Sequence, residues 1–226
     1  MKTLKTILVT LIFAGFTNLS NAVEFKTGVT VMGLSADAVG KEMSRGVEQS
    51  TNETAEAVLG SIFAEISVDL PTPFSSALAL GVDIMPYDIA DVAVTNVRSC
   101  GGAYNCQTNT ADVTVSDNQG AYLKLDLGDA GLYVKGMITF HTIEVNENIM
   151  NKTTTDTQAA SSYPDDDIAG GHVSIGIERD LGPLFVRGEI GASEYQKASS
   201  HSSSGNTTVT AQIENGTHAR ISIGKA

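Results

Sequence analysis

The sequence has no run of apolar residues long enough to cross a bilayer as a helix. Beyond residue 22, no stretch approaches the roughly 20 consecutive apolar residues that such a helix needs. Helical spacing of apolar residues is hardly visible anywhere in the chain. These two absences exclude a helical membrane protein and argue against a helical bundle.

One shorter apolar run, residues 7–16, lies near the start of the chain. It follows Lys2 and Lys5, and it precedes the small residues Ser20-Asn21-Ala22. A positive start, a short apolar core and small residues at the end form the pattern of a removable export signal. We therefore predict a signal peptide at residues 1–22 and one mature domain at 23–226.

Positive charge is also scarce. The chain holds 14 lysines and arginines against 26 aspartates and glutamates, so its formal net charge is −12. Nucleic-acid binding needs clustered Lys and Arg to contact phosphates. The composition therefore excludes nucleic acid as a partner.

Cysteine is limited to Cys100 and Cys106, which lie in a glycine-rich segment. Two cysteines alone make a poor metal site, and we expect no cofactor. Export to an oxidising compartment favours a disulfide between them. Its expected role is a staple across the tip of a loop.

Alternation of apolar with polar or small residues is the main feature from Val23 onward, and it predicts β-strands with two different faces. The clearest unit is the hairpin at 122–140. There Leu123 and Leu125 lie on one face and Lys124 on the other, and Gly-Asp-Ala-Gly at 128–131 makes a tight turn.

The same hairpin occurs twice more, at 62–84 and 173–190. Single strands at 24–31 and 209–223 complete an expected set of eight. Between the hairpins lie long segments rich in Ser, Thr, Asn, Asp and Gly, which we predict to be loops: residues 36–57, 87–116, 145–170 and 196–208.

Short turns and long loops therefore alternate along the chain, as in an up-and-down barrel of a bacterial outer membrane. The predicted fold is all-β: an eight-stranded antiparallel transmembrane barrel with short periplasmic turns and long external loops. A secreted lipocalin-like barrel would show the same alternation with its apolar face inward. Strands near the roughly nine to eleven residues of a tilted transmembrane strand favour lipid.

The polar face mixes acids and bases, which also favours a charged interior. An eight-stranded barrel is only wide enough inside to be filled by side chains. Charges confined there must pair, because an unpaired buried ion costs several kcal/mol. The predicted lumen network comprises Lys26, Glu65, Asp69, Asp83, Lys124, Asp126, Lys135, Arg187, Glu189, Glu214 and Arg220.

The segment Leu181-Gly182-Pro183-Leu184-Phe185-Val186-Arg187-Gly188 resembles the periplasmic hairpins of the OmpA/OmpX-like small outer-membrane barrels, which include opacity-type surface antigens. The resemblance implies Sec-dependent export to the outer membrane of a Gram-negative bacterium, as a monomer. Implied partners are membrane lipid, lipopolysaccharide, periplasmic chaperones and the barrel-assembly machinery. An aromatic girdle would rely on Phe74, Tyr87 and Phe140, because the chain has no tryptophan.

No residue pattern indicates catalysis, and we predict that the chain is not an enzyme. Some barrels of this kind modify lipid A with rim Ser and His residues, which keeps an enzyme open as an alternative. His141 and His218 share the polar face of the lumen, whereas His201 lies in a serine-rich loop. Asp165-Asp166-Asp167 lacks the spaced ligands of a calcium loop, so a solvated acidic turn is the favoured interpretation.

Valines at 92–97 and 113–115 continue the alternation on both sides of the cysteines. They predict an external β-ribbon, whose edge would pair with a strand of a host or phage surface protein. The expected function is envelope integrity, adhesion or phage reception. A soluble ligand-binding barrel, a lipid A-modifying enzyme and a narrow ion channel stay open as alternatives.

Overall fold

The computed structural model describes residues 23–44, 47–70, 77–97, 108–150, 163–201 and 207–226. The predicted signal peptide at 1–22, Phe74, Cys100 and Cys106 lie outside the described residues. Within them, no helix has the length and apolar character needed to span a membrane.

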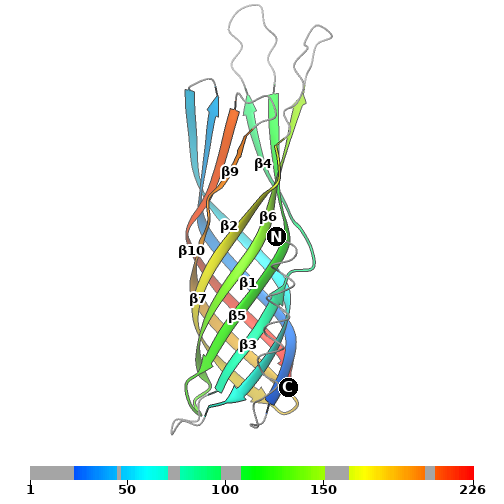
Figure 1. Cartoon of the computed structure of the whole chain (residues 1–226), viewed down its shortest axis with the longest axis vertical. Coiled ribbons are helices and arrows are strands. Elements are labelled where there is room, and N and C mark those ends of the chain that lie inside the picture. Colours follow the sequence, from blue (N-terminus) through cyan, green and yellow to red (C-terminus); the bar gives the residue numbers. More distant parts are fainter. Residues whose placement is uncertain (1–22, 45–46, 71–76, 98–107, 151–162, 202–206) are drawn as a thin grey trace, which may run out of the picture.

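The described chain forms a closed antiparallel β-barrel (Figure 1). Eight strands pair in the order β1-β2-β3-β5-β6-β7-β8-β10, and β1 pairs with β10 to close the wall, which confirms the predicted barrel. Two short strands, β4 and β9, pair only with β5 and β10. The strands are β1 Val23–Ser44, β2 Val47–Asp69, β3 Ala77–Ile84, β4 Ile89–Val97, β5 Thr108–Asp126, β6 Leu132–Met150, β7 Asp166–Leu181, β8 Leu184–Tyr195, β9 Ala198–His201 and β10 Thr207–Lys225.

Tight turns join the strands at one end of the barrel, which we call the turn end. Gly128 and Gly131 flank the β5–β6 turn at φ values of 78° and 66°, and Gly182 in the β7–β8 turn lies at 71°. This left-handed region is open to glycine at no steric cost. The Leu127 N–H donates to the Leu132 carbonyl across the turn at 2.7 Å, which holds the two strands in register.

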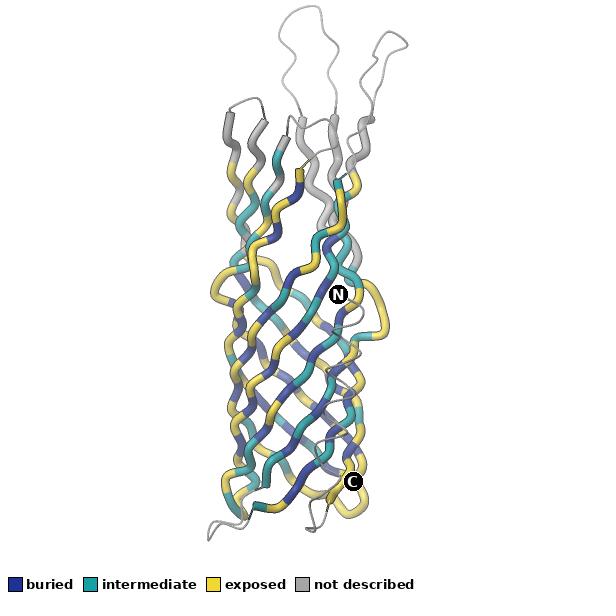
Figure 2. Tube along the Cα trace, viewed as in Figure 1, coloured by how far each residue is buried: buried dark blue, intermediate teal, exposed yellow. Residues whose placement is uncertain are grey.

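Apolar side chains cover the outside of the barrel, and polar side chains point into it. Ile138, Ile175 and Ile221 are 56%, 59% and 68% exposed, whereas Lys124 is 0% and Glu65 is 1% exposed. Figure 2 shows buried and exposed residues alternating along the strands of the wall. The barrel therefore has the inverted polarity that the mixed charges of the polar face predict.

Aromatic rings fill the lumen and lie over glycines on neighbouring strands. Tyr122 on β5 pairs with Gly81 on β3, where an added Cβ would come within 2.1 Å of the Tyr122 ring. Tyr133 covers Gly176 in the same way, at 2.3 Å. Among the described aromatic residues, several thus serve the interior rather than an outer girdle.

The segments predicted as long loops form strands over much of their length, and that prediction is wrong in this respect. β1 and β2 stay paired up to Ser44 and Val47, through most of residues 36–57. β5 and β6 likewise pair up to Thr108 and Met150. Above the wall these segments form strands without an apolar face, because their backbone N–H and C=O groups bond to each other across the paired strands.

The wall opens at the end opposite the turns, which we call the ribbon end. β3 ends at Ile84, opposite Ile62 of β2, whereas β2 itself continues to Val47. Above that point the paired strands form two groups, β9-β10-β1-β2 and β4-β5-β6, which Figure 1 shows diverging. In the parts of the chain with assigned strands, β2 and β4 each present an edge that no other strand covers.

Candidate functional site: the lumen and the ribbons

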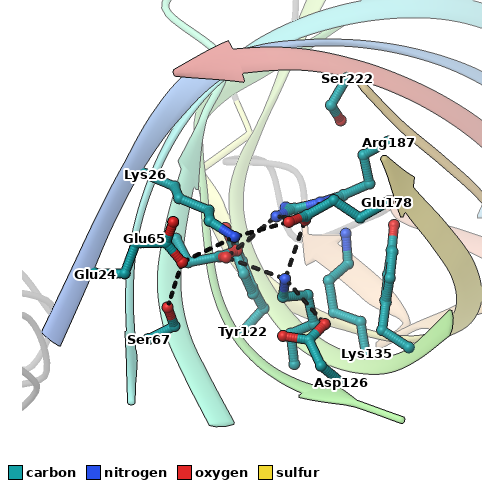
Figure 3. A network of polar contacts seen from close by, with 12 residues as sticks. Glu24, Lys26, Glu65, Ser67, Tyr122, Asp126, Lys135, Glu178, Arg187 and Ser222 are labelled. Carbon is teal, nitrogen blue, oxygen red and sulfur yellow. Dashed lines mark hydrogen bonds and ion pairs between the residues drawn. The ribbon is translucent and has the colours of Figure 1, made fainter. Parts of the chain in front are cut away.

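Glu178 on β7 is the centre of the ion network near the turn end. Its carboxylate accepts hydrogen bonds from Lys26 Nζ at 2.8 Å, Lys124 Nζ at 3.1 Å and Arg187 Nη2 at 2.5 Å. These cations come from β1, β5 and β8, and Figure 3 shows Lys26 and Arg187 meeting Glu178 inside the barrel. One carboxylate therefore ties four strands together across the lumen.

Glu65 on β2 forms the second node of this network. Arg187 donates to both of its oxygens, each at 3.1 Å, and Lys124 Nζ lies 3.2 Å away. The Tyr122 hydroxyl donates to Glu65 at 2.9 Å. Such a bidentate arginine–carboxylate pair combines strength with fixed geometry. Asp126 contacts Lys124 at 3.2 Å from a partly exposed position near the turn end.

A second group of ions lies further from the turn end. Lys135 Nζ contacts Glu189 at 2.5 and 2.6 Å, and the Tyr133 hydroxyl donates to the same carboxylate at 2.9 Å. Arg220 contacts Glu189 at 3.3 Å and also binds Asp83. Every ion of this group therefore has a partner of opposite charge on another strand.

The ions of this network pack against aromatic rings inside the barrel. The Arg187 guanidinium packs over the rings of Phe63 and Phe185 at 5.3 and 5.1 Å. Removing one member of a buried ion pair is costly, because the other charge stays behind without compensation. The described lumen network therefore pairs its charges and ties the strands together across the barrel.

The structure brings most of the predicted network together in the lumen, whereas two predicted members lie at exposed positions. The predicted members that contact an opposite charge in one of these two groups are Lys26, Glu65, Asp83, Lys124, Asp126, Lys135, Arg187, Glu189 and Arg220.

Asp69 and Glu214 are exposed instead, contrary to prediction. Asp69 ends β2, so its side chain reaches solvent at the turn end. Ser35 of β1 pairs with Thr217 of β10, and Asp37 pairs with Glu214, so β10 has one residue more than β1 between these pairs. Within this interval Asn215 adopts a φ of 49°. The extra residue is a β-bulge, which reverses the inward and outward positions beyond it and turns Glu214 out of the lumen.

Glu178, Tyr122 and Tyr133 complete the network and were missing from the predicted set. Alternation already placed Glu178 on the same face as Ser174 and Gly176. Its central position follows from strand register, which brings Glu178 opposite Arg187. The tyrosines carry hydroxyls that reach carboxylates only because glycines face their rings.

Three histidines lie in the lumen on the ribbon side of the ions. His141, His172 and His218 are all buried, whereas His201 is exposed on β9. His172 contacts both the His218 ring and the Tyr195 ring, with centroids 5.5 and 5.4 Å away.

Two residues of the acidic triplet at 165–167 bond to neighbouring strands. Asp166 accepts the backbone N–H of Ser199 at 2.8 Å, and Asp167 accepts the Thr142 hydroxyl at 2.7 Å. Over the described ranges, no group of three or more His, Cys, Asp or Glu residues is arranged to hold a metal.

The predicted external ribbon is formed by β4 and β5. Val97 pairs with Thr108 and Val92 with Val113, so the two strands run antiparallel toward the segment that holds the cysteines. The predicted disulfide itself falls outside the described residues.

No protein-family model matches the chain, and no curated protein matches it. Among solved structures, it is similar to the attachment invasion locus protein Ail of Yersinia pestis, solved with the heparin analogue sucrose octasulfate. That alignment has 8% identity and a TM-score of 0.28, and it covers 87% of this chain and 99% of Ail. The translocator domain of the autotransporter NalP from Neisseria meningitidis aligns at 12% identity and a TM-score of 0.33, over 100% and 95% of the two chains. Neither similarity carries a functional role to this chain.

Proposed function

We propose that the protein is a non-enzymatic outer-membrane β-barrel of a Gram-negative bacterium that makes contacts at the cell surface. The observation that carries this proposal is the inverted polarity of the wall. Aliphatic side chains such as Val31, Ile138 and Ile175 are more than half exposed around a charged, buried interior. Soluble proteins rarely expose apolar patches larger than a few hundred Å². Lipid is the solvent that suits such an outer face.

The same polarity argues against a lipocalin-like soluble barrel. A ligand-binding barrel of that class needs an apolar interior with room for the ligand. Here the interior holds Lys124, Glu65 and Arg187, each no more than 2% exposed and each in contact with an opposite charge. The described interior at this level is therefore charged rather than apolar.

In this proposal the turn end faces the periplasm and the ribbon end faces the outside, as in outer-membrane barrels generally. Residues 1–22 would direct Sec-dependent export, and periplasmic chaperones and the assembly machinery would insert the mature chain as a monomer. Membrane lipid and lipopolysaccharide would then surround the exposed aliphatic belt.

Surface contact is the proposed role because the ribbons present strand edges outside the barrel wall. β2 from Val47 to Gly60 and β4 from Ile89 to Val97 each lack a strand on one side in the described structure. A free edge offers a row of backbone N–H and C=O groups to an extended segment of another protein. The proposed partner is therefore a strand of a host or phage surface protein.

Cell fractionation tests the membrane proposal. We expect the protein in the outer-membrane fraction, with a gel mobility that changes on heating because the closed barrel unfolds only then. Recovery as a soluble periplasmic protein would contradict the proposal.

The role of the edge needs a separate variant that leaves the wall intact. Ala38 pairs with Glu53, so residues 39–52 can be replaced by a two-residue Asn-Gly turn that joins these positions. We expect this variant to keep its heat-modifiable mobility and to lose binding of whole cells to host cells or phage. Unchanged binding would contradict a role for residues 47–52 of the β2 edge.

A further inference from the structure

A chain of hydrogen-bonded side chains runs through the ribbon half of the lumen. His141 Nδ1 lies 2.6 Å from Asn118 Oδ1, and His141 Nε2 lies 2.9 Å from the Thr139 hydroxyl. The same hydroxyl lies 3.1 Å from His172 Nε2. All four residues are buried, and they come from β5, β6 and β7. We call this set the histidine column.

Asn118 fixes which atoms donate and which accept in the hydrogen bonds of the histidine column. Its Nδ2 lies 3.3 and 3.2 Å from the carbonyl oxygens of Tyr87 and Val115, which can only accept hydrogen bonds. The amide oxygen must therefore face His141, and because it too can only accept, His141 Nδ1 carries a hydrogen. This assignment follows from the donors and acceptors alone.

The remaining hydrogens follow in order when the imidazoles are neutral. His141 Nε2 is then an acceptor, so the Thr139 hydroxyl donates to it. The only hydrogen of that hydroxyl is thereby used, so its oxygen accepts from His172 Nε2–H. His172 is left with a bare Nδ1, and this buried atom has no hydrogen-bond partner in the described structure.

The groups around His172 offer its Nδ1 no spare negative charge. His218 on β10 lies beside it, and its own Nδ1 is also buried without a partner. Tyr195 on β8 packs against the His172 ring. The charged side chains that act on His172 electrostatically are the cations Arg220 and Lys135, which already contact Glu189 and Asp83. An added proton would therefore place a positive charge next to cations whose counter-ions are taken.

We propose that the histidine column is an acid-sensitive lock on the ribbon half of the barrel. A proton that binds Nδ1 of His172 releases the Nε2 hydrogen to the Thr139 oxygen, while the Thr139 hydrogen passes to Nε2 of His141. The charge then rests on His141, and a further proton on His172 or His218 places like charges within one layer of the lumen. Their repulsion weakens the packing of β6, β7 and β10.

Asn118 connects the histidine column to residues 85–88, where the wall of the barrel opens. Besides holding Tyr87, Asn118 accepts the Met85 N–H at its backbone oxygen at 3.0 Å, and the Tyr87 hydroxyl binds the backbone N–H of Gly60 on β2. These contacts fasten residues 85–88, which connect the end of β3 at Ile84 to the start of β4 at Ile89, at the point where the wall opens. Acid is therefore expected to loosen the base of the ribbons before the ion network at the turn end.

Urea unfolding of the full barrel in detergent micelles between pH 8 and 5.5 tests the proposal. Histidines kept neutral in the fold become protonated in the unfolded chain below their ordinary pKa of about 6.5, so stability falls as the pH falls. We expect the unfolding equilibrium constant to rise by up to about tenfold per pH unit for each such histidine. H172Q and H218Q should each reduce this dependence, whereas H201Q, at an exposed site on β9, should leave it unchanged.

A nitrogen-15 NMR measurement of the imidazoles provides a test that needs no variant to fold. At pH 8 we expect His141 protonated at Nδ1 and His172 at Nε2. The opposite tautomers, a wild-type barrel whose stability is the same at pH 8 and 5.5, or equal pH dependence in H172Q, H218Q and H201Q would each overturn the proposal.

Discussion

At the scale of single residues, Glu178 has more charged partners than any other described carboxylate of the lumen network. Lys26, Lys124 and Arg187 approach it from three strands, and no substitution that removes its charge can satisfy all of them. Alternation placed these cations on the inner face, but it could not predict which carboxylate would meet them. That choice depends on strand register, which the sequence pattern leaves open.

Replacing Glu178 by glutamine should therefore destabilise the barrel strongly. Breaking a buried ion pair by removing one partner costs about 3–5 kcal/mol. Urea unfolding in detergent micelles would measure the change, and E194Q provides the control because Glu194 is exposed on β8. Equal stability of E178Q and E194Q would contradict a structural role for this carboxylate.

Two glycines test whether close packing in the lumen stabilises the barrel, because Gly81 lies against a ring in the lumen and Gly136 does not. G81A would bring a Cβ to within 2.1 Å of the Tyr122 ring, whereas the Cβ of G136A would meet nothing within 4 Å. Overpacking of this kind costs about 1–3 kcal/mol, and displaced Tyr122 would also lose its hydrogen bond to Glu65. We expect a lower unfolding midpoint for G81A alone; a similar loss in both variants would argue against ring-on-glycine packing.

At the scale of strands, alternation predicted the eight wall strands because one face of each must be apolar and the other polar. Alternation did not predict the strands above the wall, where β1 and β2 continue through a segment rich in Ser, Thr and Glu that was predicted to be a loop. Paired backbones need no apolar face there, so composition alone could not distinguish a ribbon from a loop. It also missed the bulge at Asn215, because a single extra residue leaves no trace in the pattern.

That bulge provides the prediction at this scale. Asn215 holds a φ of 49°, a conformation that costs an ordinary side chain about 1–2 kcal/mol and glycine very little. N215V should therefore lower the free energy of unfolding by about that amount, while N215G should not. Thermal or urea midpoints of the two variants would show it, and equal midpoints would contradict a left-handed residue at this position.

At the scale of the whole molecule, the account depends on which side of the wall meets lipid. The closed pairing of β1 with β10, the exposed aliphatic belt and the paired ions of the lumen all follow from one choice of inner and outer face. The sequence predicted this choice from the mixture of acids and bases on one face. It could not predict the histidine column, whose order depends on distances between three strands.

The absence of tryptophan from the chain allows a direct measurement of that orientation. A single tryptophan is introduced at outward-facing Ile175, which is 59% exposed, or in the lumen at Tyr133, which is 1% exposed. In vesicles, the fluorescence of I175W should be quenched by brominated acyl chains and protected from aqueous acrylamide, while Y133W should respond little to brominated lipid. Quenching of I175W by acrylamide with no effect of brominated lipid would contradict the proposed membrane barrel.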